Sequence, residues 1–487
     1  MYTKLKRFER SLKPIYQPFK HQSEAFEAVK DKEYFGIFHE QGLGKTKIAI
    51  DLALHWLEKN ECDSVLFIAK KSLVENWQNE IKNHTDHFPI VFSPSKKTNY
   101  SKFHSSAHLY IAHYDLIKND LENFEQFCKL RKVGIILDES VAIKNPTTAV
   151  SKAFHKLAPL VFKRIIMTGT PVDNRPHDIW SQIYFLDQGK SLGTKFKPFK
   201  EDHDLTREIN ESFFEKNKYE QRLLKLKENI APFTLRETKS STELHLPKKN
   251  YKRIEVDMDN DQRNIYETVR RQYSMEIIKD NKKKIEEFAF IAVKLLRLIQ
   301  ISSDPSIFDE SYKNDPPKLV ALKDILSKIP SEEKAIVWTN FIKTAENIQR
   351  KLNSKKTLCI TGNIDIDQRN KIINEFKTNP NKKVLISTVG VAKEGLTLTV
   401  ANHAIYFERN FSLSDYLQSQ DRIHRISQEK ISYIYNIFTK NSVEEWLEAL
   451  VMAKESAACL IQGDIDQIEF SKKINYDFGE ILDKILM

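Results

Sequence analysis

The sequence predicts an α/β protein built from two domains in tandem, each with a parallel β-sheet. Three observations support this prediction. Short apolar, β-branched runs alternate with helix-like segments, as parallel strands do when helices cover both faces of their sheet. The runs form two series with a long gap between them. Residues of chemical interest follow several of the runs, and ligands of open α/β sheets bind at the carboxyl ends of strands.

The first series of expected strands occupies the N-terminal half of the chain. It begins with residues 34–38, which precede a helix-like run at residues 47–56. The other runs of this series are residues 64–69, 109–112, 134–137 and 164–167. Lys45, Asp138 and Thr168 each follow a run of this series.

The second series follows in the C-terminal half. Its runs are residues 335–339, 357–360, 384–387, 404–407 and 433–438. Thr339 and Ser387 stand at the ends of two of them. Two series imply two α/β domains, which we place at residues 1–235 and 236–487.

Between about residues 188 and 334 the strand pattern lapses, and charge-laced helix-like segments replace it, such as residues 207–230 and 261–301. We interpret these segments as helical insertions on the two domains, at about residues 188–235 and 255–315. The crossover between the domains is expected near residues 232–247. The tail, residues 442–487, is expected to be helical and amphipathic.

The composition is that of an ordinary globular protein, with 40% hydrophobic and 30% charged residues among 487. The formal net charge of +10 favours a polyanionic partner, most simply nucleic acid. The four cysteines are far apart and form no C-x-x-C pair, which argues against a zinc site or a disulfide framework. The first residues lack the apolar run of a signal peptide, and no stretch approaches a membrane span. We therefore expect a cytoplasmic protein without a membrane partner.

The most informative feature is the segment FHEQGLGKT at residues 38–46, between an expected strand and an expected helix. Gly42 and Gly44 let the backbone approach a phosphate closely, so that N–H groups of the loop and helix start face the anion. Lys45 can reach the β- and γ-phosphates, and the hydroxyl of Thr46 can hold Mg²⁺. His39 stands where the phosphate-loop consensus has its first glycine.

Two adjacent carboxylates end the apolar run at residues 134–137. Beside a phosphate loop, this is the pattern of the second half of a nucleoside-triphosphatase site. Asp138 would orient Mg²⁺, and Glu139 would polarise the attacking water.

A third polar segment, QSQDRIHRISQ, occupies residues 418–428. Arg422 and Arg425 are three residues apart, so we expect them to share one face of a helix. A guanidinium supplied across a cleft can neutralise charge on a transferring γ-phosphoryl group. Trp77 and Trp180, by contrast, are expected to be packing residues.

Together these segments resemble the Swi/Snf-related ATPases of helicase superfamily two. Further segments match that family in the same order along nearly the whole chain: residues 19–22 (FKHQ), 72–77 (SLVENW), 138–145 (DESVAIKN), 168–171 (TGTP) with Asn174, 235–239 (LRETK) with residues 246–247 (LP), and Ser387 and Thr388 with residues 394–398 (EGLTL). The family's usual first motif also lacks the initial glycine, which accounts for His39. The resemblance implies two RecA-like lobes with helical insertions, and ATP with Mg²⁺ as ligands.

Carried over residue by residue, the resemblance implies a role for each position. Gln22 would contact adenine, Lys45 and Thr46 would hold phosphates and Mg²⁺, Asp138 would position the metal, and Glu139 would act as general base. Gln418, Arg422 and Arg425 would stabilise the γ-phosphate from the second lobe, while Thr168 and Thr170 would couple nucleotide state to the nucleic-acid groove. Backbone phosphates of the nucleic acid are expected near Lys70, Lys71, Ser72, His113, Tyr114, Thr339, Asn340, Ser387 and Thr388. Val141 departs from the family, which usually has His there, and this puts the coupling of ATP to DNA in question.

The resemblance implies a motor that hydrolyses ATP and moves along double-stranded or branched DNA, displacing proteins or migrating junctions. Three alternatives stay open. The chain could be a strand-separating helicase on DNA or RNA, the motor subunit of a nuclease or restriction complex, or an inactive binding module. The presence of Lys45, Asp138, Glu139 and Arg422 argues against the inactive module. A compact motor of this kind fits a bacterium or a virus.

Overall fold

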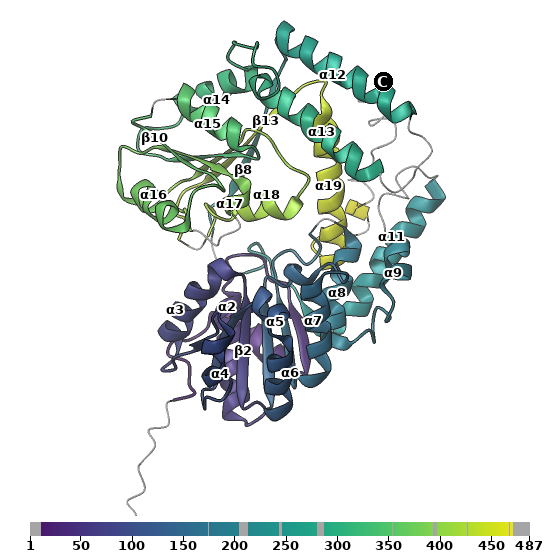
Figure 1. The fold of residues 1–487 in the computed structure, drawn as a ribbon, viewed down its shortest axis with the longest axis vertical. Helices are drawn as coiled ribbons and strands as arrows, with labels where there is room; N and C mark the ends of the chain where they lie inside the picture. The colour runs from purple at the N-terminus through teal and green to yellow at the C-terminus, as the bar shows by residue number, and fades with distance from the viewer. Residues whose placement is uncertain are drawn as a thin grey trace, which may run out of the picture. The chain divides into compact units, whose positions relative to one another are not determined.

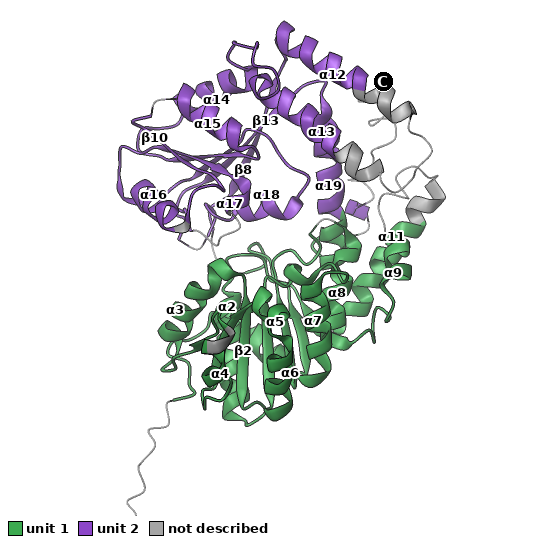
Figure 2. Cartoon of the chain, in the orientation of Figure 1, with its two compact units in different colours: residues 1–208, 213–244, 457–467 green, residues 209–212, 245–456, 468–487 purple. Residues whose placement is uncertain are grey.

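The computed structural model describes residues 11–470 apart from residues 174, 204–212, 243–245, 280–286, 353, 393–396, 426 and 467. The chain divides into two compact units (Figure 2). Unit 1 comprises residues 1–208, 213–244 and 457–467, and unit 2 comprises residues 209–212, 245–456 and 468–487. This division differs from the boundary expected after residue 235, because residues 236–244 and the C-terminal segment 457–467 are grouped with unit 1.

A parallel seven-stranded sheet forms the centre of unit 1, in the order β3-β4-β2-β5-β6-β1-β7 (Figure 1). Its strands are β1 (Tyr34–Ile37), β2 (Ser64–Ala69), β3 (Ile90–Val91), β4 (Leu109–His113), β5 (Val133–Asp138), β6 (Lys163–Met167) and β7 (Thr234–Leu235). Ala69 pairs with His113, and Asp138 pairs with Met167, so neighbouring strands end at the same level. The residues that follow these strands therefore gather at one edge of the sheet.

Most helices of unit 1 flank this sheet, while α9 and α11 lie beyond α8 (Figure 1). The helices of this unit are α1 (Lys20–Val29), α2 (Lys45–Glu58), α3 (Val74–His84), α4 (Lys96–Phe103), α5 (Tyr114–Asn119), α6 (Leu121–Leu130), α7 (Ala149–Leu157), α8 (Trp180–Asp187), α9 (Phe196–Asp202) and α11 (Phe213–Ile230). The helices α1 to α3 cover one face, where Trp56 and Trp77 pack in one core with Phe67 of β2. Leu66 and Ile68, the neighbours of Phe67 in β2, point to the opposite face of the sheet and are also fully buried. Both faces of β2 are therefore covered.

Unit 2 contains a parallel six-stranded sheet in the order β10-β11-β9-β12-β13-β8. Its strands are β8 (Lys249–Val256), β9 (Ala335–Thr339), β10 (Thr357–Ile360), β11 (Val384–Thr388), β12 (His403–Tyr406) and β13 (Ser432–Thr439). Thr388 of β11 pairs with Thr339 of β9, which again brings two strand ends level. The sequence prediction of two parallel-sheet domains is thus confirmed.

The helices of unit 2 are α12 (Asn260–Lys279), α13 (Glu287–Ser303), α14 (Pro317–Ser327), α15 (Ile342–Lys351), α16 (Ile366–Thr378), α17 (Val389–Ala392), α18 (Leu413–Gln420) and most of α19 (Val443–Gln462). Two cores lie on the two faces of the sheet. Ile336 and Trp338 of β9 belong to one core, while Ala335 and Val337 belong to the other. This alternation explains why the strand reads as a continuous apolar run.

One sequence expectation about the fold is wrong. The strand pattern was expected to lapse from about residue 188 to 334, but β7 and β8 lie in that interval. The eight residues of β8, KNYKRIEV, are mostly exposed, and β8 is the last strand in its sheet's order. An edge strand carries charged residues that prevent further pairing, so it lacks the apolar run by which the other strands are recognised.

Helix-like segments were expected at residues 207–230 and 261–301, within the helical insertions, and α11, α12 and α13 lie there, whereas residues 207–212 and 280–286 lie outside the described residues. The amphipathic tail is expected from residue 442, and α19 forms its first part, whereas residues 471–487 lie outside the described residues. Within the described part of the chain, no helix combines the length and the apolar composition that a membrane crossing requires.

Candidate functional site

The glycine-rich loop between β1 and α2 has the backbone that a phosphate-binding loop needs. Gly42 has φ +89° and Gly44 has φ +74°, and both lie in the left-handed region that favours glycine. Gly44 is also the N-cap of α2, so the N–H groups that begin this helix lie directly after the loop. A Cβ atom on Gly44 would lie 2.1 Å from Nε2 of Gln22. The left-handed loop conformation therefore favours glycine here, and a side chain at this position would have to displace the Gln22 amide.

Gln22 is buried on α1 and is fixed at both ends of its amide. Its Nε2 donates to the carbonyl of Leu43 over 3.3 Å, and its Oε1 accepts from the backbone N–H of Phe19 over 2.9 Å. His21 contacts the same Leu43 carbonyl through Nε2 at 2.9 Å. Gln22 thus lies against the glycine-rich loop, and its contact with adenine stays a prediction.

Lys45 begins α2 and turns back over the loop. Its Nζ donates to the carbonyl oxygens of His39 and Glu40 over 2.8 and 3.3 Å. Thr46, the next residue of the first helical turn, is partly exposed. His39 itself is fully buried, and this burial, with the nearby Lys45 charge, lowers the pKa of its ring to about 3. The imidazole is therefore neutral at physiological pH and adds no charge to the loop.

Asp138 ends β5 and is held by two aromatic residues. Nε1 of Trp77 donates to Oδ2 of Asp138 over 2.8 Å, and the hydroxyl of Tyr114 donates to its backbone carbonyl over 2.7 Å. Burial, together with the adjacent Glu139 carboxylate, raises the pKa of Asp138 to about 6. A cation in this place would relieve that cost. The hydroxyl of Thr46 and the carboxylate of Asp138 are oxygen ligands of the kind that Mg²⁺ prefers.

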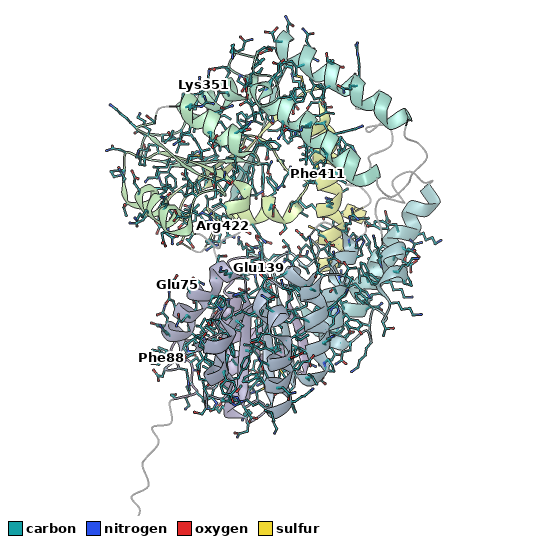
Figure 3. All side chains as sticks on the ribbon, in the orientation of Figure 1. Glu75, Phe88, Glu139, Lys351, Phe411 and Arg422 are labelled. Carbon is teal, nitrogen blue, oxygen red and sulfur yellow. The ribbon has the colours of Figure 1, made fainter. Side chains whose placement is uncertain are left out.

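Glu139 lies where three loops of the sheet edge meet, and it is labelled at the upper edge of unit 1 in Figure 3. Its Oε1 accepts from Nε2 of Gln41 over 3.5 Å, and its Oε2 accepts from the hydroxyl of Thr168 over 3.3 Å. Its backbone has φ +53°, a left-handed conformation that is uncommon for a residue with a side chain. Backbone strain of this kind gathers at functional sites.

The loop after β6 packs directly on the phosphate loop. The Thr168 hydroxyl accepts from the backbone N–H of Thr170 over 3.2 Å, and both threonines are buried. A Cβ atom on Gly169 would lie 2.7 Å from Cγ of Gln41. The structure therefore brings Gln41, Glu139 and Thr168 together in unit 1. Such a site can orient a water molecule beside a bound phosphate.

The residues expected near nucleic acid in unit 1 lie at the same sheet edge. Lys70, Lys71 and Ser72 follow β2, and His113 ends β4, the neighbouring strand. Lys71 and Ser72 are exposed, whereas His113 is partly buried, which lowers the pKa of its ring. Tyr114 is buried, and its hydroxyl donates to the backbone carbonyl of Asp138.

In unit 2 the expected nucleic-acid contacts also gather at one edge, but their side chains turn inward. Thr339, Ser387 and Thr388 are buried. The Thr339 hydroxyl donates to Oε1 of Glu408, and the backbone N–H of Asn340 donates to the same oxygen over 2.7 Å. Burial raises the pKa of Glu408 to about 7.

The expectation that Arg422 and Arg425 share a helix face is wrong. Helix α18 contains Gln418 but ends at Gln420. Beyond it the backbone tightens into turns, in which the N–H groups of Arg422 and Ile423 bond to carbonyls three residues back. The side chain of Gln428 donates to the carbonyl of Ile423 over 2.8 Å and so replaces a helical bond.

Both arginines are nevertheless held in fixed positions. Arg422 is buried, and its carbonyl accepts from the backbone N–H of Leu398 over 2.8 Å. Arg425 donates from Nε to the Asp421 carbonyl over 3.0 Å and from Nη1 to the hydroxyl of Thr397 over 2.5 Å. Burial lowers the pKa of Arg425 from its ordinary value. Action of these arginines on a nucleotide bound to unit 1 stays a prediction.

Sequence reasoning missed several residues of the site. Gln41, Arg236 and Glu408 were not singled out, and Trp77 was expected only to pack, although it also binds Asp138. Gln41 lies within the glycine-rich loop, so its position was a usable signal. Arg236 lies in the segment 235–239 that matches the family, although no role was assigned to it, and Glu408 contacts Thr339 and Asn340 in unit 2 from a position that no matched segment marks. The expected motif residues Asn174, Glu394 and Gly395 lie outside the described residues.

Comparisons with known proteins identify the family. Residues 31–307, more than half of the chain, match the family model described as the SNF2-related domain. Residues 317–427 match the model described as the helicase conserved C-terminal domain.

Similar curated proteins are larger. A protein of Mycoplasma genitalium named as an ATP-dependent helicase is 27% identical over 425 residues, which cover 86% of this chain and 39% of that protein. The Bacillus subtilis protein YwqA, named as an ATP-dependent helicase/translocase, is 26% identical over 439 residues, with coverages of 86% and 45%. The chain thus spans less than half the length of these relatives. Among solved structures, the SWI2/SNF2 ATPase core of Sulfolobus solfataricus in complex with dsDNA is 23% identical, with coverages of 96% and 97% and a TM-score of 0.42.

Proposed function

Because the chain belongs to the SNF2-related family, we propose that it hydrolyses ATP and uses the energy to move along duplex DNA. The observation that carries the proposal is the meeting of Gln41, Glu139 and Thr168 beside the glycine-rich loop of unit 1. It supports hydrolysis because a carboxylate held at this place can orient water for attack on a phosphate. The +10 net charge supports a nucleic-acid partner.

In this proposal each residue of the site in unit 1 has its own role in the reaction. The loop N–H groups and Lys45 bind the phosphates, and Gln22 contacts the adenine. Thr46 and Asp138 would hold Mg²⁺, which would offset negative charge on the bound phosphates. Glu139 orients the attacking water and takes up its proton. Gln41 and Thr168 hold the Glu139 carboxylate in place for this task.

In this proposal unit 2 completes the catalytic site and holds DNA. Arg422 and Arg425 neutralise the γ-phosphate, and Gln418 is expected beside them. ATP can then drive a cycle through its higher affinity for one arrangement of the two units. Contacts to backbone phosphates position the protein without reading bases, so we expect little sequence preference and a strong dependence on salt. Movement of this kind displaces bound proteins or migrates branched junctions.

Steady-state ATP hydrolysis tests the first half of the proposal. The rate is measured without nucleic acid and with duplex DNA, branched DNA, single-stranded DNA or RNA, at low and moderate salt. Glu139→Gln serves as the inactive variant, and Glu122→Gln, an exposed carboxylate on α6, as its matched control. We expect stimulation by duplex or branched DNA in the wild type and the control, and a rate at background in Glu139→Gln.

Other outcomes point to other functions. Stimulation by single strands or RNA alone would favour a strand-separating helicase. Hydrolysis that Glu139→Gln does not reduce would contradict the assigned base.

A further inference from the structure

Arg236, which follows β7, connects three separate parts of unit 1. Its Nη1 donates to the carbonyl of Phe38 over 2.6 Å and to the carbonyl of Gly169 over 3.1 Å. Phe38 enters the glycine-rich loop, and Gly169 lies in the loop that packs on Gln41. The same guanidinium donates from Nε and Nη2 to the two carboxylate oxygens of Asp464, over 3.1 and 2.8 Å.

The segment around Arg236 runs beside the glycine-rich loop as an extension of the sheet. The N–H of Phe38 donates to the carbonyl of Leu235, and the N–H of Glu40 donates to that of Glu237, each over 2.8 Å. The backbone N–H of Lys239 donates to Oε2 of Glu40 over 2.8 Å. The entrance of the loop therefore cannot move without breaking contacts to this segment.

Asp464 comes from a distant part of the sequence. It lies just after α19, in the segment 457–467. This segment belongs to unit 1, although it follows most of unit 2 in the sequence (Figure 2). Its backbone N–H bonds to the carbonyl of Cys459 over 2.8 Å, which ties it to the last turn of the helix. The ion pair is sheltered, since the side chains of Arg236 and Asp464 are 17% and 18% exposed. A bidentate pair of this geometry fixes the orientation of a guanidinium, and not only its charge.

We propose that Asp464 is a positioning residue for ATP hydrolysis, acting through Arg236. With the pair intact, the guanidinium bridges the carbonyls of Phe38 and Gly169 and sets the spacing of the two loops. That spacing holds Gln41 and Thr168 on the Glu139 carboxylate. The C-terminal segment 457–467 is thereby part of the catalytic unit, and any partner or truncation that removes it slows hydrolysis. This inference rests on the proposed ATPase function.

Hydrolysis by Asp464→Asn is the first test. The substitution keeps the shape of the side chain and removes the charged pair. We expect kcat to fall about fivefold to tenfold while KM for ATP changes less than twofold, because Gln22 and Lys45 still bind nucleotide. Asp464→Glu should recover at least half of the wild-type kcat. Glu61→Gln is the matched control, since Glu61 pairs with Lys163 over 2.6 Å at the opposite end of the same sheet, and this variant should keep its kcat.

Hydrogen exchange of the nucleotide-free protein is the second test, and it does not depend on activity. In Asp464→Asn we expect faster exchange in residues 457–463 and also in residues 38–43 and 168–171. Faster exchange in residues 457–463 alone would overturn the inference, because the segment would then be docked without holding the loops. An unchanged kcat in Asp464→Asn, with Glu139→Gln inactive, would overturn it as well and leave the ATPase proposal standing. Absence of hydrolysis in the wild type would instead refute the ATPase proposal, and the exchange result would still decide whether Asp464 holds the loops.

Discussion

Nε1 of Trp77 donates a hydrogen bond to Oδ2 of Asp138 over 2.8 Å, so a buried indole on α3 fixes the carboxylate at the end of β5. The bond favours the charged carboxylate and works against burial, which raises the pKa of Asp138. The same side chain therefore packs the core of unit 1 and prepares the proposed metal ligand.

Trp77→Phe should separate these two roles. The phenyl ring keeps much of the packing, so we expect a loss of about 1–2 kcal/mol in the free energy of unfolding from the smaller volume and the missing hydrogen bond. The Mg²⁺ concentration for half-maximal hydrolysis should rise severalfold, because Asp138 loses a donor that orients it. Trp56→Phe is the control, since the Trp56 indole donates to the Lys30 carbonyl over 3.0 Å, away from the acidic pair. An equal Mg²⁺ requirement in both variants would contradict the positioning role.

Gly44→Ala should weaken nucleotide binding for two reasons. A side chain at φ +74° is strained by about 1–2 kcal/mol, and its Cβ would meet the amide of Gln22. We expect the affinity for ATP, measured by titration calorimetry, to fall more than tenfold. Gly193→Ala carries the same kind of strain at φ +78° with nothing within 4 Å of the new Cβ. That control should lose stability and keep its ATP affinity; a matching loss of affinity would mean that the close approach of Gln22 is unimportant.

Glu408 should make unit 2 less stable as the pH rises. Its pKa is about 7 in the folded protein against an ordinary value of 4.5, so the native state binds more protons between these values. The stabilisation is complete below pH 4.5 and is lost as the pH rises through 7, by up to about 3 kcal/mol in total. Glu408→Gln should remove this part of the pH dependence of stability. The backbone amide of Asn340, which bonds to this side chain, should then be protected from hydrogen exchange at pH 8. Identical pH dependence in both proteins would show that Glu408 does not titrate in this range.

Arg422→Ala should reduce kcat with duplex DNA by about 10²-fold or more, as loss of an arginine that neutralises the γ-phosphate does. Arg409→Ala is the control, because Arg409 lies over the ring of Tyr416 in the same unit, with its guanidinium 3.7 Å from the ring centre. Single-turnover hydrolysis separates the chemical step from binding. An Arg422→Ala rate equal to that of Arg409→Ala would remove Arg422 from the catalytic set.

Much of the fold could be predicted from the sequence because buried parallel strands are apolar on both faces. Residues 64–69, 335–339 and 357–360 were expected as strands, and β2, β9 and β10 have those same bounds. The edge strand β8 could not be found in this way, since its side chains are exposed. The turns after α18 were also missed, because the side chain of Gln428, six residues beyond Arg422, replaces the helical bond.

In the candidate site, too, the sequence predicts the residues that belong to a local pattern and not the contacts between distant segments. The glycine-rich loop and the pair Asp138–Glu139 were recognisable because each is a local pattern after a strand. The pairing of Arg236 with Asp464 was not, since 228 residues separate them and only the folded chain brings them together.

Movement along duplex DNA is the central claim, and displacement of a triplex-forming strand from a DNA duplex tests it most directly. The third strand lies in the path of the protein, and its release is followed over time with ATP, without ATP and with Glu139→Gln. The account predicts release that requires both ATP and Glu139 and that leaves the duplex strands paired. Duplex-stimulated hydrolysis without release of the third strand, or release that Glu139→Gln matches, would contradict it.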